Sequence, residues 1–320
     1  MNRSIKLAHA VLAASQVCSA SAQIDRYVVS TGTTGSVSNC FGVAATSDGG
    51  CIIVGDGAYP GLIKLNSTGL LDWQRAYFLS PNTSAGTGRG ILESSFGGYA
   101  MTLFAASSPG FEVGLLRVDS SGVPLWGWLA EADFLNDPTG YKQLDTTRSR
   151  QLPVESEAYA TIGNRTVIPG TTVSRGVLML VDATLSQATS VQVSSDAGEV
   201  ALADIDVSPS GIFILGTIKR PSTKGCEEQM DGLLAWFGLS GNVIQAWTFD
   251  STRLPDPGRC FTDEWGCGIA VDGDTVYFTL ADTMAYSGTG NAYVAAFDCS
   301  SATLTWSRQI LSFLAHVPLC

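Results

Sequence analysis

Histidine is almost absent from this chain, which contains only His9 and His316. His9 lies in an N-terminal segment that we expect to be removed on export, and His316 stands close to the C-terminal end. A Ser-His-Asp triad, a Cys-His pair and a histidine zinc site each need an oriented imidazole. The sequence therefore disfavours all three, and we interpret His316 as a solvent-exposed residue.

Charged residues are also scarce, and the basic ones do not cluster. Only 15% of the residues are charged, and 18 Lys and Arg against 29 Asp and Glu give a net charge of −11. Nucleic-acid binding needs clustered Lys and Arg to meet phosphates, so we expect no nucleic-acid partner. Beyond the N-terminus no apolar run is long enough to cross a bilayer, so we predict no membrane span.

Residues 1–22 have the pattern of a cleavable signal peptide. A short basic stretch is followed by an apolar run too short to span a membrane, and the small residues Ala20 and Ala22 precede Gln23. This is the arrangement that signal peptidase cleaves. We therefore expect a mature β-propeller repeat domain at residues 23–320 and a secreted or periplasmic location.

Glycine is abundant, with 35 residues, and it recurs inside a repeated segment. The clearest copy has an Asp48-Gly49 turn followed by Lys64, Gly69 and Trp73. The last three positions recur 53 residues later in a second copy, and three further copies follow. The final motif position is occupied in the five copies by Trp73, Trp126, Thr189, Trp247 and Trp306.

Each feature of the repeat has a physical reason. Asp-Gly and Gly-Gly between apolar runs supply the positive φ angles of a tight hairpin. Continuously apolar inner strands suit sheets that stack on both faces, and a repeat of four short strands matches a propeller blade. We predict an all-β chain, a β-propeller of about five four-stranded blades, or a truncated member of a larger propeller. Ile24–Ser30 resembles an outer strand that could pair with the last blade and close the ring.

Segments Leu65–Trp73 and Val294–Trp306 resemble the turn-and-tryptophan signature of quinoprotein-type (PQQ-like) propeller blades. The Asp48–Gly50 hairpin, with Gly55 and Lys64, is similar to bacterial secreted propeller repeat proteins. The resemblance implies stacked blades around a central channel in an exported binding or assembly platform. Quinoprotein dehydrogenases of that class also carry a cofactor, calcium and commonly adjacent cysteines. This chain has no adjacent cysteines and is shorter than an eight-bladed enzyme requires, so we expect no cofactor.

A carboxylate pair is the one catalytic arrangement that the composition leaves open, because glycosidases need only two acids. Asp204, Asp206, Glu264 and Asp272 lie on or near the predicted innermost strands. Asp272 falls in a predicted hairpin turn, and the first two acids would equally serve to cap a strand end. We therefore assign no catalytic residue. The segment around Asp204 also has too few acids for a calcium loop, so we assign no metal site.

The tryptophans at the repeated position are expected to pack between blades as large inter-sheet side chains. They are Trp73, Trp126, Trp247 and Trp306. Trp128, Trp236 and Trp265 lie off that position. Trp265 precedes an innermost strand at the expected channel mouth, so it is our candidate for a ligand-binding surface.

Seven cysteines remain after the predicted cleavage, which suggests disulfides and one unpaired thiol in an exported protein. Cys40 and Cys51 lie too far apart along the first hairpin to bond. We predict a disulfide between Cys226 and Cys260, which lie in loops expected on the same face of a propeller. Cys260 with Cys267 is the competing pair.

Three sequons occur in the predicted mature chain, at Asn66, Asn82 and Asn164. Such asparagines accept a bulky, solubilising glycan at a protein surface. They matter only where the exporting cell is eukaryotic.

These features predict an exported, non-catalytic binding or assembly module with the channel mouth as its ligand surface. Its partner would be an unknown protein or carbohydrate. One alternative is a carbohydrate-active hydrolase that uses a channel carboxylate pair. Another is a quinoprotein-like cofactor-binding protein, which would carry a chromophore.

Overall fold

All regular secondary structure in the described part of the chain is β-strand. The computed structural model describes residues 22–23, 28–30, 39–56, 59–78, 83–107, 111–130, 142–167, 173–183, 188–196, 198–220, 229–249, 262–284 and 289–314. These ranges contain no helix that could cross a membrane. The predicted signal peptide lies almost wholly outside them and stays a prediction.

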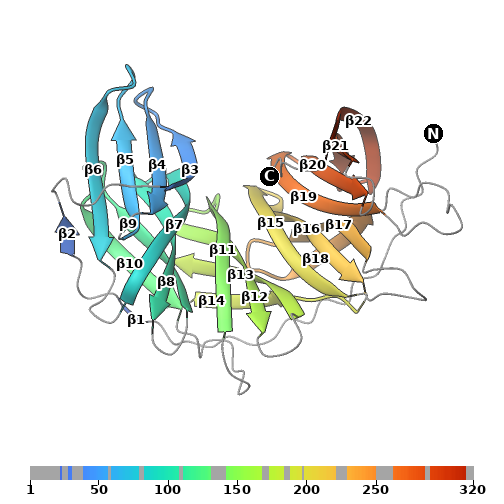
Figure 1. The fold of residues 1–320 in the computed structure, drawn as a ribbon, viewed down its shortest axis with the longest axis horizontal. Helices are drawn as coiled ribbons and strands as arrows, with labels where there is room; N and C mark the ends of the chain where they lie inside the picture. The colour runs from blue at the N-terminus through green and yellow to red at the C-terminus, as the bar shows by residue number, and fades with distance from the viewer. Residues whose placement is uncertain are drawn as a thin grey trace, which may run out of the picture. The chain divides into compact units, whose positions relative to one another are not determined.

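Contacts divide the chain into two compact units, each of which is described by itself. The N-terminal unit comprises Gln16–Val173 and Met179–Ser190, and the C-terminal unit consists mainly of Val191–Cys320. The first holds two whole sheets and most of a third, of which Ser174–Leu178 belongs to the C-terminal unit, and the second holds two whole sheets (Figure 1).

The N-terminal unit contains two antiparallel sheets and most of a third, and their strands follow one another in sequence. The first sheet consists of β3 (Asn39–Ala45), β4 (Cys51–Asp56), β5 (Gly61–Leu65) and β6 (Leu71–Phe78), with β2 (Val28–Ser30) added at the edge of β6. The second consists of β7 (Thr83–Glu93), β8 (Tyr99–Ser107), β9 (Phe111–Val118) and β10 (Pro124–Ala130), with β1 (Ala22–Gln23) added at the edge of β10. The third consists of β11 (Lys142–Gln151), β12 (Ala158–Val167), β13 (Val173–Asp182) and β14 (Ala188–Val193).

The C-terminal unit contains the fourth and fifth sheets, built in the same way. The fourth consists of β15 (Glu199–Ser208), β16 (Gly211–Arg220), β17 (Gln229–Phe237) and β18 (Val243–Phe249). The fifth consists of β19 (Thr262–Asp272), β20 (Thr275–Met284), β21 (Thr289–Asp298) and β22 (Thr303–Leu314). Five successive four-stranded antiparallel sheets confirm the predicted fold class, with five blades.

Tight turns form where the repeat predicted them. In the first blade Thr46 N donates to Gly50 O at 3.0 Å, and Gly49 has a φ of 81°. Gly69 has a φ of 79° in the turn between the third and fourth strands. Glycine is favoured at both positions because side chains disfavour positive φ. These turns set the register of the flanking strands.

The prediction for Ile24–Ser30 is wrong in its partner. Val28 pairs with Phe78 and Ser30 pairs with Ala76, so β2 extends the outer edge of the first blade and not of the fifth. An outer strand has one hydrogen-bonding edge free, and any free edge accepts an added strand. The sequence of such a strand therefore does not specify which blade it joins.

Neighbouring sheets within the N-terminal unit share an apolar core. Apolar side chains from the first two blades form one cluster, and Trp73 packs against it. At about 25 cal/mol per Å² of apolar surface, this inter-sheet burial is the main force holding blades together. The buried members are Ile52, Val54, Leu62, Tyr77, Tyr99, Met101, Leu103, Leu116 and Val118.

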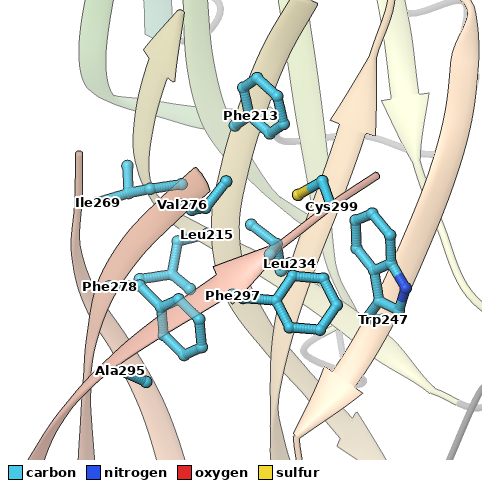
Figure 2. Packing of buried hydrophobic residues seen from close by; sticks show 10 residues of the cluster. All are labelled: Phe213, Leu215, Leu234, Trp247, Ile269, Val276, Phe278, Ala295, Phe297 and Cys299. Atoms are coloured by element: carbon cyan, nitrogen blue, oxygen red, sulfur yellow. The ribbon is translucent and has the colours of Figure 1, made fainter. Parts of the chain in front are cut away.

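The C-terminal unit has an equivalent core between its two sheets. Figure 2 shows ten of its residues, with the rings of Trp247 and Phe297 side by side. Their centroids lie 4.8 Å apart in an edge-to-face arrangement, a geometry that adds to the burial energy. Both side chains are fully buried.

Candidate functional site

The two ends of every blade differ in how the strands are joined. Strands one and three run in the same direction, so the turns that follow them lie at one end, which we call the turn end. The connections after strands two and four lie at the opposite end, which we call the loop end. The two ends and the edge of the innermost strand between them are the candidate surfaces for a ligand site.

The turn end is occupied by hydrogen bonds between blades. In the first two blades, side chains of β6 donate to carbonyl groups of the β9–β10 turn. The bonds run from Trp73 Nε1 to Ser120 O (3.1 Å), Arg75 Nε to Ser121 O (2.7 Å) and Tyr77 Oη to Gly122 O (2.9 Å). Such bonds fix neighbouring blades in one register.

The innermost hairpins are joined in the same way. Glu93 of the second blade accepts bonds from the backbone and hydroxyl of Ser47 at 2.7 and 2.8 Å. In the next blade Gln151 accepts a bond from Ser95 N at 2.8 Å and donates to its hydroxyl at 2.6 Å. Because these polar groups already have protein partners, the turn end is structural.

A buried donor on the third strand supports the first hairpin of several blades. Lys64, 1% exposed, donates to Asp48 at 2.7 Å. This hydrogen bond is the main cause that holds the pKa of Asp48 well below its usual range. In the fourth blade the same place is taken by Trp236, whose Nε1 donates to Ser210 O at 3.1 Å. An indole N–H can thus replace an ammonium group where the turn offers only a carbonyl.

Arg117 is the equivalent residue of the second blade and is fully buried. It donates to Glu157 Oε1 at 2.5 Å and to Tyr159 Oη at 2.9 Å, both in the third blade. It also donates to Val118 O at 2.6 Å, Tyr99 O at 3.2 Å and Gly97 O. Burial raises the pKa of Tyr159, which stays neutral and can also donate. The group is a hydrogen-bonded ionic lock between two blades.

The predicted acid candidates Asp204 and Asp206 accept hydrogen bonds from the backbone of the next blade. Asp204 Oδ2 accepts from Ile269 N at 3.1 Å, and Asp206 Oδ2 accepts from Val271 N at 2.9 Å. Both acids lie on β15, and both donors lie on β19 of the next blade. The two carboxylates therefore join neighbouring innermost strands from within β15, a role different from the strand-end capping that the sequence suggested.

The other acids and the aromatic candidate lie on β19. Asp272 is exposed at the end of the strand, beside the hairpin, as its turn interpretation predicted. Glu264 stands opposite Asp282 in the β19–β20 ladder, and Trp265 stands opposite Ala281. The side chains of Glu264 and Trp265 lie outside the described residues, so the ligand role of Trp265 stays a prediction.

A β-bulge interrupts the innermost strand of every blade at a similar height. The extra residue is Phe41, Thr147, Ala203 or Cys267 in β3, β11, β15 and β19 and falls within Arg89–Gly90 in β7. Bulges turn a side chain out of the ladder and are enriched beside active sites. Sequence reasoning missed them, although a glycine on the second strand (Gly55, Gly163, Gly216) pairs beside three of the five.

The bulges of the first two blades bring Arg89 over the ring of Phe41, with the guanidinium carbon 4.4 Å from the ring centre. Towards the loop end, Asn39 Nδ2 donates to Asp56 Oδ1 at 2.8 Å. Thr87 Oγ1 lies 3.5 Å from Asp56 Oδ2. We call these five residues the blade 1–2 polar group; it combines an amide, a carboxylate, a hydroxyl, a cation and an aromatic ring.

Potential metal ligands do not cluster in the described part of the chain. The described residues contain no group of three or more His, Cys, Asp or Glu that could hold a metal ion.

The described cysteines include both free and bonded residues. Cys40, Cys51 and Cys299 are free thiols, which agrees with the exclusion of a Cys40–Cys51 bond. Cys267 is disulfide-bonded. The predicted partners Cys226 and Cys260 lie outside the described residues, so that disulfide stays a prediction.

Three of the four repeated tryptophans pack between blades as predicted. Trp73 lies 6.0 Å from Tyr99, Trp126 lies 5.9 Å from Tyr159, and Trp247 contacts Phe297 as described. Trp306 differs, because it is 43% exposed and its ring partner is Tyr277 of its own sheet, at 6.5 Å. It lies on the outer strand β22 of the last described sheet.

No protein-family model matches the chain, including any of the quinoprotein type, and no curated protein matches it. Three of the solved structures that match share 12–13% identity with the chain. A glycosyl hydrolase from Bacteroides ovatus has a TM-score of 0.40, with 85% of this chain and 87% of that chain covered. The GH43 endo-arabinanase from Bacillus licheniformis has a TM-score of 0.38, with coverages of 87% and 96%. An oligogalacturonate lyase in complex with manganese has a TM-score of 0.41, with coverages of 98% and 75%.

Proposed function

We propose that the protein is an exported, non-catalytic binding module whose ligand lies at the loop end of the innermost strands. The observation that supports this most directly is the use of Asp204 and Asp206 as acceptors for the amides of Ile269 and Val271. Two acids that were candidates for catalysis thereby have a structural role. The turn end is likewise occupied by bonds between blades.

The ligand is a polar molecule with a flat or weakly apolar face, and an oligosaccharide fits this description. In the blade 1–2 polar group an amide, a carboxylate and a hydroxyl bond one another, and a sugar hydroxyl would join this set of bonds. The Arg89–Phe41 pair adds a cation held against an aromatic ring, at 4.4 Å. A few convergent polar groups beside an apolar surface are typical of small-ligand sites.

The test is a binding measurement with the full chain. An array of neutral and acidic oligosaccharides identifies a probe, and calorimetry with that probe compares Arg89→Met with Arg308→Met. Arg308 is a matched control because it is an exposed arginine on the outer strand β22. We expect Arg89→Met to weaken binding at least tenfold and Arg308→Met to leave it unchanged. Equal effects of the two variants, or no bound sugar on the array, would contradict the proposal.

A carbohydrate hydrolase is the second candidate, and one observation favours it. The β19–β20 register sets Glu264 directly opposite Asp282 near the loop end. Glycosidases act through two carboxyl groups at a set separation, and opposite residues of a ladder are near neighbours. This pair is a better catalytic candidate than Asp204 with Asp206.

Release of reducing sugar from polysaccharides separates the two candidates. An activity lost in Glu264→Gln and in Asp282→Asn but kept in Asp274→Asn, an exposed turn acid, would establish the hydrolase and overturn the binding module. Absence of release by the wild-type chain, with sugar binding retained, supports the binding module. A visible chromophore in the purified protein would overturn both in favour of a cofactor-binding protein.

A further inference from the structure

The turn between β5 and β6 of the first blade carries a sequon whose asparagine has a defined structural role. Asn66 Oδ1 accepts bonds from Thr68 N at 3.0 Å, Thr68 Oγ1 at 2.7 Å and Leu70 N at 3.0 Å. Its backbone N–H and C=O close the turn with Leu70 O and Gly69 N. The side-chain amide nitrogen Nδ2 takes part in none of these bonds.

The second blade shows that the turn needs only the acceptor oxygen. Asp119 occupies the equivalent position, and its Oδ1 accepts from Ser121 N at 2.9 Å, Ser121 Oγ at 2.8 Å and Val123 N at 2.8 Å. An aspartate therefore closes the same turn as Asn66. Since turn chemistry is satisfied by either residue, the amide of Asn66 is available for a second purpose.

The surface next to Asn66 is apolar and exposed. Leu70 is 66% exposed and Leu71 is 61% exposed, although both follow directly on the turn. Adjacent exposed leucines are a solubility liability in a secreted protein. A glycan on Asn66 would cover them with a hydrated polymer.

We propose that Asn66 is an N-glycosylation site of the exported protein. The inference rests on the proposed export, in a cell whose secretory route supplies a lipid-diphosphate-linked oligosaccharide. Nδ2 forms a bond to C1 of the first sugar, the C1–O bond to the diphosphate breaks, and the lipid diphosphate leaves with the electron pair. Nδ2 loses one proton to the transferase. Oδ1 is unchanged by this reaction, so the folded turn keeps all three of its bonds.

The other described sequon is placed differently. Asn164 lies in β12, which has β11 and β13 on either side, and it stands opposite Asp145. A glycan on Asn164 would be attached to a central strand of a sheet and not to a turn. We therefore expect no glycan on Asn164 in the secreted protein.

The experiment expresses the full chain with its own N-terminus in a eukaryotic secretory host. The secreted protein is treated with peptide-N-glycosidase, which converts a glycosylated asparagine into aspartate, and peptide mass spectrometry locates the change. We expect conversion at Asn66 and none at Asn164. The control Asn66→Asp keeps Oδ1, so it should fold and be secreted without the glycan, and Thr68→Ala should also lack it.

Two outcomes would overturn the proposal in different ways. If the chain does not enter the secretory route, both the proposed export and this site are wrong. If the chain is secreted but Asn66 is not converted, the site alone is wrong. Folding of the Asn66→Asp variant, checked by its tryptophan fluorescence, separates loss of the glycan from loss of structure.

Discussion

Replacing Arg117 by methionine tests the ionic lock between the second and third blades. Methionine fills a comparable volume but donates no hydrogen bond. The change leaves the Glu157 carboxylate, whose side chain is 17% exposed, without its cation. It also removes the donor from the carbonyl groups of Gly97, Tyr99 and Val118. Removing one partner of a buried ion pair costs about 3–5 kcal/mol, because the other charge stays buried.

The loss of stability should depend on whether the acid that remains is buried and charged. In the double variant Arg117→Met with Glu157→Gln the buried charge is gone, so we expect about 1–3 kcal/mol to be regained. Lys64→Met is the matched comparison, since its partner Asp48 has a side chain that is 54% exposed and can be hydrated. We expect a smaller loss for Lys64→Met than for Arg117→Met.

Denaturant unfolding followed by tryptophan fluorescence measures these differences as shifts in transition midpoint. A loss below about 1 kcal/mol for Arg117→Met would refute the argument, because it is less than the net value of one charged hydrogen bond. Equal losses for the two single variants would show that burial of the remaining acid does not set the cost.

The remaining predictions concern titration and the cysteines. The depressed pKa of Asp48 means that its bond to Lys64 contributes stability above the unfolded-state pKa of about 4 and loses it as pH falls towards the folded value. The stability difference between wild type and Lys64→Met should therefore be constant near neutral pH and shrink in strong acid. Cys40 is exposed and should react with a thiol reagent in the native protein. Cys299 is 2% exposed, and burial raises the pKa of its thiol to about 12. The Cys299 thiol should therefore react with the same reagent only when the protein unfolds. Non-reducing peptide mapping should find Cys267 in a disulfide.

Each of these predictions can be contradicted by a specific result. A pH-independent difference for Lys64→Met would show that the Asp48 bond is not what the lysine contributes. Equal labelling rates for Cys40 and Cys299 in the native protein would contradict their difference in burial. Recovery of Cys267 as a free thiol would remove the described disulfide.

The repeat predicts the blades because each strand and turn is encoded locally. Spacing alone identified Lys64 and Arg117 as equivalent, and both occupy the third strand as buried cations. Their acids could not be inferred from the repeat, since one comes from the first hairpin of the same blade and the other from the next blade. The sequence did indicate that the two partners differ. The second copy has a cation at the Lys64 position but has Phe96 where the first copy has Asp48, so its cation needs an acid from elsewhere.

The candidate site was harder to predict for the same reason. The sequence places Asp204 and Asp206 on a strand but does not encode which amides of the neighbouring blade face them. The blade 1–2 polar group was missed because Phe41 and Arg89 come together only through bulges, and a bulge is one extra residue with little local signature. The strand β2 pairs with the first blade and not with the fifth. Which free sheet edge a strand joins depends on which edge it can reach, and the sequence pattern of the strand does not encode this.

The bulge in each innermost strand has a consequence for how such a scaffold can change. An extra residue has no partner in the ladder, so its side chain can be exchanged without shifting the register of the strand. The residues present are correspondingly diverse, and Phe41, Ala203 and Cys267 share neither size nor chemistry. A library randomised at Phe41 and Ala203, with the disulfide-bonded Cys267 kept, would vary the surface of the innermost strands while sparing the blade cores. Each blade can thus acquire new specificity independently, one residue at a time.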